Sequence, residues 1–274
     1  MRQLAGTLMI HLVLITGSII FLLPFFWMLS TSLKDPGVVF LFPPQWIPNP
    51  VVLQNYVTAL TILPFGIFYR NTAFITIVAL IGQLLSSSIV AYSFARLRWR
   101  GRDSLFVLVL ATMMLPHQVT LVPQFILYKY LGWLDTFFPL IVPAFFGAPF
   151  FVFLLRQFFM TIPIEMDDAA RIDGCGNFAI YWRLALPLSK PALAAVAIFS
   201  FQFHWNDFFE PLIYLQSNDH YTVSLALRFF QGSYGTLWNL LMAASNVAML
   251  PLIILFFVAQ RYFIQGVVFT GVKG

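Results

Sequence analysis

The sequence predicts an all-α membrane protein with six transmembrane helices. Its 274 residues are 60% hydrophobic and only 9% charged, with a mean hydropathy of +0.86, whereas a soluble domain is about 45–50% apolar and about 25% charged. Six apolar runs are close to the roughly 20 residues needed to cross the hydrocarbon of a bilayer. The Lys and Arg residues also gather in alternate connections, which is the pattern that membrane topology imposes.

The six apolar runs are the expected spans. They are Leu8–Leu29, Thr72–Ala95, Ser104–Leu127, Phe137–Leu155, Leu188–Leu215 and Leu240–Phe263. The first run is too long for the core of a signal peptide, and no small-residue cleavage site follows it. We therefore expect it to remain as a transmembrane helix.

Two longer connections are expected on the external side. Lys34–Tyr69 is rich in proline and aromatic residues, and should be extended with one short interfacial helix near Leu53–Leu60. The second connection is Gln216–Trp238. Asn246, inside the last span, is more typical of a hydrogen bond between helices than of a pathway lining, although both remain open.

The distribution of Lys and Arg sets the orientation, because these residues are enriched in cytoplasmic connections. With a cytoplasmic amino terminus, eleven of the 15 lie inside: Arg2, Arg96, Arg98, Arg100, Arg102, Arg156, Arg171, Arg183, Lys190, Arg261 and Lys273. The four outside are Lys34, Arg70, Lys129 and Arg228. Both termini are therefore expected in the cytoplasm, together with the connection between the fourth and fifth spans.

That connection, Pro163–Pro191, is the most charged and least apolar part of the chain. Links between helices in bundles usually have about 2–8 residues, so its length needs a further explanation. Pro163 favours the start of a helix, and Gly174 favours a left-handed helix end. Asp167 lies four residues before Arg171, a spacing that favours an ion pair along one helix.

A second short helix is expected at Asn177–Leu186, ending before Pro187. In the first helix, Glu165, Asp167 and Asp168 fall in the opening turn, where the helix dipole favours negative charge. By pattern alone, the segment is equally typical of an amphipathic loop that lies in water and merely joins two spans.

Polar side chains interrupt the third span. Pro116 removes a backbone hydrogen bond there, and His117 and Gln118 follow it. These side chains either face a translocation pathway or belong to a packing kink whose polar groups are satisfied by neighbouring helices. For His117 the structural role is the more typical one.

The outer part of the fifth span carries Asn206, Asp207 and Glu210. Asp207 and Glu210, three residues apart, would share one face of a continuous helix, and ionisable side chains in a span usually face a cavity or a partner. Alternatively, the helix ends near Trp205 and the acids lie at the aqueous interface. The candidate pathway residues are Gln118, Asn206, Asp207 and Glu210.

The residue patterns needed for ATP hydrolysis, an internal disulfide, metal binding or enzyme catalysis are absent from this sequence. No Gly-x-x-x-x-Gly-Lys-Ser/Thr loop occurs, so the chain is not expected to hydrolyse ATP by itself. A single cysteine, Cys175, excludes an internal disulfide, and no cluster of metal ligands or of nucleophile and base suggests an enzyme. The net charge of +5 is explained by topology and not by binding to nucleic acid.

The charged connection resembles the "EAA" loop of bacterial ABC-importer permeases, in which Glu-Ala-Ala is followed at fixed spacing by Gly and by Ile-x-Leu-Pro. Here the motif falls on Asp168-Ala169-Ala170, Gly174, Leu184 and Leu186-Pro187, with Asp for Glu and Leu for Ile. The resemblance implies that residues 163–187, the coupling segment, dock on a separate ATPase subunit. The residues implied in coupling are Glu165, Asp168, Ala169, Ala170, Arg171, Asp173, Gly174, Leu186 and Pro187.

Trp205-Asn206-Asp207, Leu115-Pro116 with Gln118-Val119, and the glycine-containing tail extend this resemblance over the whole chain. The chain is similar to maltose-type carbohydrate ABC-importer permeases, and within them to the second, MalG-like member of the pair. This resemblance implies the type I ABC-importer permease fold, with 1–274 as a single integral membrane domain. The transmembrane core is then about 68–262, and a cytoplasmic tail occupies 263–274.

The resemblance also implies partners: a second homologous permease, two nucleotide-binding ATPase subunits that hold ATP and magnesium, and an extracytoplasmic solute-binding protein. The expected place is the bacterial inner membrane, and the expected solute is a sugar or a sugar-like compound. A non-sugar solute such as glycerol 3-phosphate remains an alternative. A stand-alone secondary transporter is less favoured, because internal repeats and charges in several spans are not seen.

Overall fold

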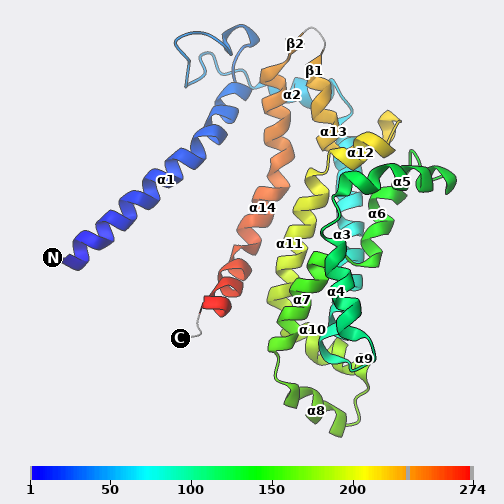
Figure 1. The fold of residues 1–274 in the computed structure, drawn as a ribbon. Coiled ribbons are helices and arrows are strands. Elements are labelled where there is room, and N and C mark those ends of the chain that lie inside the picture. Colours follow the sequence, from blue (N-terminus) through cyan, green and yellow to red (C-terminus); the bar gives the residue numbers. More distant parts are fainter. Residues whose placement is uncertain (1, 233–234, 272–274) are drawn as a thin grey trace. The chain divides into compact units, whose positions relative to one another are not determined.

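The computed structural model describes residues 2–232 and 235–271, with the side chains of 6–116, 118–232 and 235–260, and most of this chain is helical (Figure 1). The α-helices are α1 (Arg2–Ser32), α2 (Gln54–Thr61), α3 (Phe65–Arg96), α4 (Arg102–Thr112), α5 (His117–Tyr130), α6 (Phe138–Ile141), α7 (Pro149–Thr161), α8 (Ile164–Ile172), α9 (Asn177–Ile180), α10 (Leu186–Leu188), α11 (Lys190–Asn206), α12 (Phe209–Tyr214), α13 (Val223–Leu227) and α14 (Trp238–Gly271). The fold class predicted from composition is confirmed.

Shorter elements connect these helices. The 3₁₀ helices are η1 (Pro36–Val38), η2 (Val142–Phe146), η4 (Asn218–His220) and η5 (Arg228–Phe230), and η3 (Tyr181–Ala185) is a π-helical turn. Strands β1 (Gln231–Gly232) and β2 (Gly235–Thr236) form an antiparallel pair. The helix predicted near Leu53–Leu60 is confirmed as α2.

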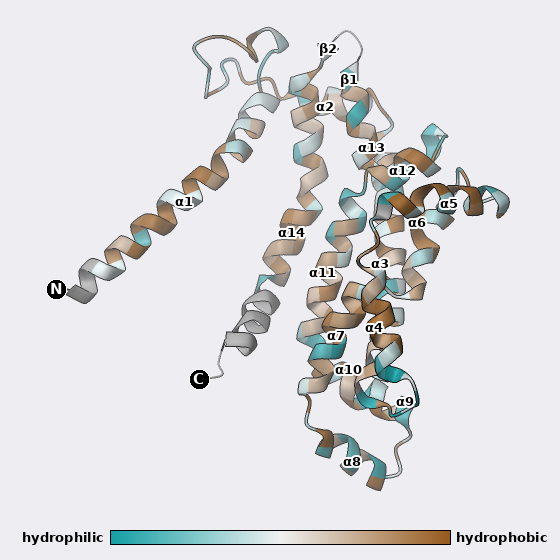
Figure 2. Ribbon diagram, in the orientation of Figure 1, coloured by the Kyte–Doolittle hydropathy of each residue, from teal (hydrophilic) through white to brown (hydrophobic). Residues whose placement is uncertain are grey.

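Within the described residues, four helical stretches are long and apolar enough to cross a membrane. They are Gly6–Ser32, Phe65–Arg96, Phe138–Thr161 and Trp238–Gln260. A fifth arises if Asn177–Leu188 and Lys190–Asn206, which are bent by 78° at their junction, form one span. The described side chains of α1, from Gly6 onward, are largely exposed, and its residues are mostly apolar along the ribbon (Figure 2). The chain is thus a multi-pass membrane protein.

The third predicted span is two helices, α4 and α5, because Pro116 interrupts it. Helix α4 ends at Thr112, and Pro116 stands before α5 in an extended conformation with ψ 134°. The interruption predicted at Pro116 is confirmed, since proline supplies no N–H to continue the helix. If α4 and α5 together count as one span, the helices are consistent with the six predicted spans.

The last helix runs further than predicted. We expected a tail from 263, but α14 continues to Gly271. Residues 272–274 of the predicted tail lie outside the described residues, as do the side chains from Arg261 onward.

The chain divides into two compact units, and each is described by itself. The first unit comprises Met1–Gly66 and Leu225–Leu250, and the second comprises Ile67–Ser224 and Pro251–Gly274. A buried polar network connects the elements of the first unit. Asn55 donates to the carbonyl oxygens of Ser32 (2.9 Å) and Lys34 (2.8 Å), and Asn239 donates to Asn55 Oδ1 (3.0 Å).

Helix α14 joins the same network through Asn246. Its amide donates to the hydroxyl of Tyr56 at 3.1 Å, and that hydroxyl also lies 2.8 Å from Ser32 Oγ. Asn246 therefore makes the hydrogen bond between helices that was the more typical of its two roles.

The second unit has an apolar core where α3, α4, α7 and α11 meet α9 and η3. Leu155, Phe159 and Val196 are fully buried there. Gly82 lets the ring of Phe145 approach α3, since a Cβ at Gly82 would lie 2.5 Å from ring carbons. Ser86 Oγ donates to the carbonyl of Ala144 at 3.0 Å, one turn further along α3.

Away from that core, Asp135 ties the loop after α5 to the segment after α12. Its Oδ1 accepts from the backbone N–H groups of Gln216 and Ser217, both at 2.9 Å, and lies 3.2 Å from His220 Nδ1. The Ser217 hydroxyl donates to Oδ2. Burial alone would raise the pKa of this carboxyl, but the hydrogen bonds outweigh it and hold the pKa well below its usual range.

Asp135→Asn should therefore destabilise this loop connection. Asparagine tolerates the positive φ of 58° at this position, so the change removes mainly the charge and one acceptor. Hydrogen bonds to charged groups contribute roughly 1.5–3 kcal/mol each, and we expect a lower thermal unfolding midpoint in detergent. The exposed Asp219→Asn in the same segment is the control and should change the midpoint little.

The same variant predicts a pH dependence. A carboxyl whose pKa is lowered by folding adds stability above its unfolded pKa of about 3.9, and this contribution is lost as pH falls towards the folded value. The midpoint difference between wild type and Asp135→Asn should thus persist from about pH 8 to about pH 5 and shrink below about pH 4. A difference that shrank near neutral pH would contradict this role of Asp135.

Candidate functional site

The predicted coupling segment folds as a helix, a break and a second helix. Pro163 precedes α8 in an extended conformation, and Glu165 and Asp167 lie in the first turn. Gly174 has φ +83°, the left-handed conformation predicted for the helix end. The local structure of this segment therefore follows from its residue types, and α8 lies at one end of the second unit beyond α7 and α9 (Figure 1).

Helix α8 has almost no hydrophobic core of its own. Asp167 is the one buried residue among its nine, and Ala170 packs partly against the core of the second unit. The side chains of Glu165, Asp168 and Ala169 are exposed. Ile172 is 88% exposed, which is an unusual position for a large apolar residue on a helix that lies outside the apolar spans.

Arg96, the last residue of α3, holds α8 to the bundle. Its Nε donates to Asp167 Oδ2 and its Nη2 to Asp167 Oδ1, both at 2.9 Å. Nη1 donates to the carbonyls of Ile162 at 2.8 Å and Phe159 at 3.4 Å, and Nη2 donates to that of Pro163 at 3.1 Å. We call this arrangement the Arg96 clamp.

The prediction of an ion pair between Asp167 and Arg171 is wrong. Arg171 Nη1 pairs instead with Asp168 Oδ1 at 2.9 Å on the exposed face, three residues back along the helix. Asp167 faces the bundle, where Arg96 offers two parallel donors and a dry surrounding. The bidentate geometry is the stronger interaction, so the tertiary contact replaced the local one.

The remaining predicted coupling residues lie at the end of α8 and after it. Asp173 ends α8 and is exposed, whereas Leu186 packs partly against the core. The helical run that begins at Asn177 does not stop before Pro187 as predicted: it continues through α9, η3 and α10 to Leu188. The π-helical turn of η3 immediately precedes α10, so the proline falls where the regular bonding pattern is already changed.

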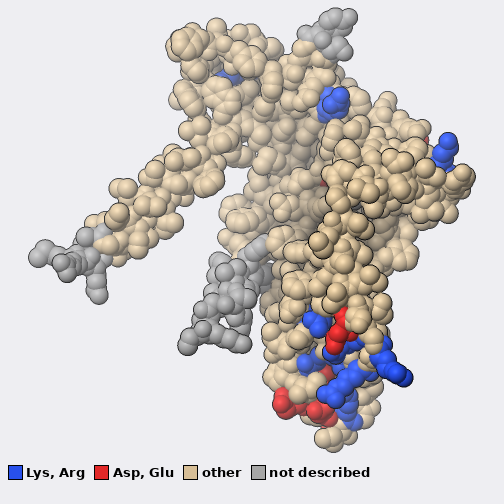
Figure 3. Space-filling view, in the orientation of Figure 1, with Lys and Arg blue, Asp and Glu red and all other residues tan. Residues whose placement is uncertain are grey.

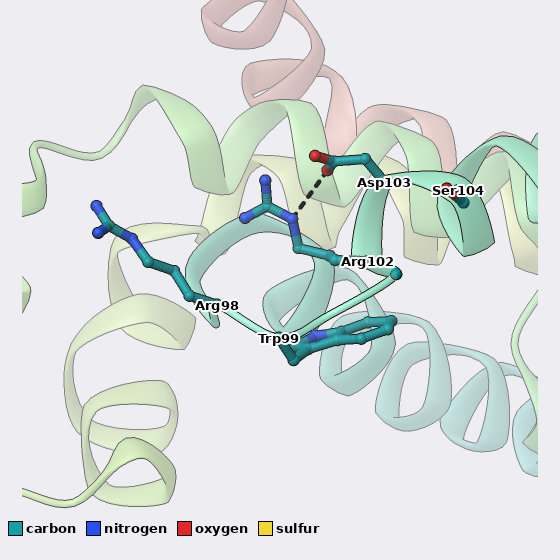
Figure 4. A pocket seen from close by; sticks show the side chains of 6 residues that line it. Arg98, Trp99, Arg102, Asp103 and Ser104 are labelled. Carbon is teal, nitrogen blue, oxygen red and sulfur yellow. Dashed lines mark hydrogen bonds and ion pairs between the residues drawn. The ribbon is translucent and has the colours of Figure 1, made fainter.

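Charged side chains of both signs gather at this end of the second unit. Figure 3 shows Lys and Arg beside the acidic residues at this end, whereas elsewhere on the face shown the charged residues are scattered. A pocket of about 400 Å³ lies at the turn between α3 and α4, lined by Arg98, Trp99, Gly101, Arg102, Asp103 and Ser104. Arg102 Nε donates to Asp103 Oδ1 at 2.9 Å across this turn (Figure 4).

The four arginines that marked this side in the sequence therefore differ in role. Arg96 is buried in the clamp, Arg102 is paired with Asp103, and Arg98 and Arg100 are exposed. Charge counting treats all four alike. The one sequence signal that could have distinguished Arg96 is its position at the end of the apolar run, as the last residue of a helix.

The predicted pathway residues lie at helix ends. Helix α11 ends at Asn206, so Asp207 and Glu210 do not share a face of one continuous helix. Asp207 Oδ1 accepts from the backbone N–H groups of Phe209 (3.1 Å) and Glu210 (3.3 Å) and so caps α12. The helix end near Trp205 in the second of the two alternatives is therefore seen, whereas the place of these acids at the aqueous interface stays a prediction. Gln118 is exposed near the start of α5. Contact of the four candidate pathway residues with solute stays a prediction.

No group of three or more His, Cys, Asp or Glu side chains that could hold a metal ion occurs within the described part of the chain. The features of the second unit are a polar clamp, an exposed helix and capped helix ends. They can transmit force and bind a partner.

A family model and several known proteins match most of this chain. Residues 83–268 match the family model described as "Binding-protein-dependent transport system inner membrane component". The arabinooligosaccharides transport system permease protein AraQ of Halalkalibacterium halodurans is 37% identical over 246 residues, covering 89% of this chain and 86% of that protein. The sn-glycerol-3-phosphate transport system permease protein UgpE of Yersinia pestis is 32% identical over 266 residues, covering 94% of both chains.

The fold also has a solved counterpart. A chain of a bacterial ABC transporter involved in the import of the acidic polysaccharide alginate superposes with a TM-score of 0.83 at 23% identity, covering 94% of this chain and 96% of that one. This likeness shows that the two chains share a fold, and the family match covers more than half of the sequence. The chain belongs to the family of binding-protein-dependent transport system inner membrane components.

Proposed function

We propose that this chain is one of two permease subunits of an ABC importer for a sugar or a sugar-like solute. In this proposal α8 docks on one of two separate ATPase subunits, which bind ATP and magnesium and drive transport. A second permease completes the pathway, and an extracytoplasmic solute-binding protein delivers the solute. Both termini and α8 lie on the cytoplasmic side of the inner membrane, as the eleven inner Lys and Arg residues favour.

The observation that carries this proposal is the exposure of α8. A helix that buries only Asp167 and exposes Ile172 and Ala169 gains little from its own packing. Exposed apolar side chains among charged ones are typical of an interaction surface. Its position between two spans makes a rigid, charged helix available to a cytoplasmic partner.

The solute class is supported by named relatives and by local residues. One relative carries arabinooligosaccharides in its name, and a solved transporter of similar fold was captured with an alginate pentasaccharide-bound periplasmic protein. Asn206, Asp207 and Glu210 add hydrogen-bonding groups near the end of α11, which suits a hydroxylated solute that requires no covalent chemistry.

Glycerol 3-phosphate is the second candidate, because UgpE of Yersinia pestis is similar over 94% of this chain. The two candidates differ in the phosphate group, so they are separable by competition. An oligosaccharide importer should ignore phosphate esters, whereas a glycerol 3-phosphate importer should be inhibited by them.

Purification and reconstitution test the proposal. The tagged protein should be isolated in mild detergent from its native host with a second permease and an ATP-hydrolysing subunit. In proteoliposomes with ATP inside and binding protein outside, uptake should follow one member of a panel of radiolabelled arabino-oligosaccharides, alginate oligosaccharides and glycerol 3-phosphate. Uptake by the isolated chain with no ATPase subunit, or labelling of α8 from outside the cell, would contradict the proposal.

A further inference from the structure

We infer that Arg96 is a positioning residue for coupling: the Arg96 clamp makes α8 move with the end of α3, so that force on α8 reaches the helix bundle through one guanidinium group. The inference rests on the proposed function, in which α8 receives that force. It assigns a transmitting role to Arg96 and Asp167, neither of which is a motif position of the coupling segment.

The clamp uses every donor that arginine has. A guanidinium carries five N–H groups in a fixed planar fork, and the five hydrogen bonds of Arg96 go to Asp167 twice and to the carbonyls of Phe159, Ile162 and Pro163. These carbonyls lie at and after the end of α7, where the helix supplies no N–H group from a following turn. Those of Phe159 and Pro163 also accept from the backbone N–H groups of Ile162 and Met166, both at 3.3 Å. One side chain thus joins the end of α3, the end of α7 and the inner face of α8.

Burial makes this junction rigid. The side chain of Arg96 is 5% exposed and that of Asp167 is 0% exposed, so water does not compete for the bonds and salt does not screen them. By contrast, the Arg171–Asp168 pair of the same helix has side chains 42% and 60% exposed. That pair also joins two residues of α8 to each other and holds the helix to nothing else, so among the described residues the clamp is the main side-chain attachment of α8 to the bundle.

The covalent connections of α8 are poor alternatives for transmission. On one side the chain turns at Pro163, and on the other it leaves α8 through Gly174 in the left-handed conformation. Short non-helical connections of this kind can bend at a few backbone dihedral angles. Because Ala170 is the one further α8 side chain packed against the core, loss of the clamp should let α8 tilt while its neighbours stay folded.

The test combines a probe of α8 docking with a measurement of coupling. The variants are Asp167→Asn, Arg96→Lys and the double variant Arg96→Gln/Asp167→Asn, which leaves no unpaired buried charge and therefore has the best prospect of folding. Control variants are Arg102→Lys and Asp103→Asn, which alter an ion pair of the same length, 2.9 Å, at the nearby turn. Cys175, the single cysteine, is partly buried against the core beside α8, and its maleimide labelling rate reports docking.

In the full complex, we expect faster labelling of Cys175 in all three clamp variants. Solute transported per ATP hydrolysed should fall roughly 2- to 30-fold, whereas basal ATP hydrolysis and the amount of co-purified ATPase subunit should change little. The two control variants should label and transport like wild type. A fall in transport with an unchanged ratio of solute to ATP would indicate a merely structural role and overturn the inference.

Two other results would also overturn it. Labelling of Cys175 that stays at the wild-type rate would show that the clamp does not hold α8. Faster labelling with a normal ratio of solute to ATP would show that α8 transmits force by another route. Failure of the proposed function is distinguishable from both, since wild-type complex would then show no ATP-driven uptake at all.

Discussion

Ala169→Arg should abolish ATP-driven uptake while the protein still inserts into the membrane. Ala169 is exposed on α8, next to Asp168 and on the face that the Arg96 clamp leaves free. A large cation there would fill the space in which a partner surface approaches closely, and burying a charge without a partner is costly. Folding should be unaffected, because the new side chain extends into water.

The measurement is uptake of the radiolabelled solute by proteoliposomes, together with stimulation of ATP hydrolysis by the binding protein. Both should drop to the level of liposomes without the complex. Ser104→Arg is the matched control, since Ser104 is also exposed at this end of the second unit but lies outside α8. Retention of full uptake by Ala169→Arg would remove Ala169 from the docking surface.

Residue-level rules predicted those features of the coupling segment that depend on one residue and its own backbone. Gly174 is an example, because a left-handed helix end favours glycine whatever surrounds it. The break at Pro116 is another, since a missing N–H interrupts any helix. Such features are local, and they appear in the structure where the sequence places them.

The same rules did not predict features that depend on the packing of distant segments. The spacing rule paired Asp167 with Arg171 because it considers one helix alone, yet Arg96, 71 residues away along the chain from Asp167, supplied the stronger partner. Pro187 was expected to end a helix, and the π-helical turn before it allowed the run to continue to Leu188. The polar groups of Asp207 cap α12, a use that no periodicity of the fifth span indicates.

Gly174→Val should reduce uptake about tenfold or more, because a non-glycine residue pays roughly 1–2 kcal/mol in the left-handed region and a β-branched residue fits there least well. Gly174 has φ +83°, and a Cβ there would meet nothing within 4 Å, so the effect comes from the backbone alone. Relief of this strain would rotate the chain after α8 and shift the helix from the position that a partner recognises.

Gly176→Val separates that effect from any change of side-chain size in the same connection. Gly176 also has open space around its Cβ position, but its φ of −75° and ψ of 165° are extended values that valine adopts readily. Uptake should therefore be near normal in Gly176→Val and strongly reduced in Gly174→Val, at equal amounts of protein in the membrane. Equal loss in both variants would show that the connection tolerates no side chain, and equal retention would show that the left-handed turn is not needed for coupling.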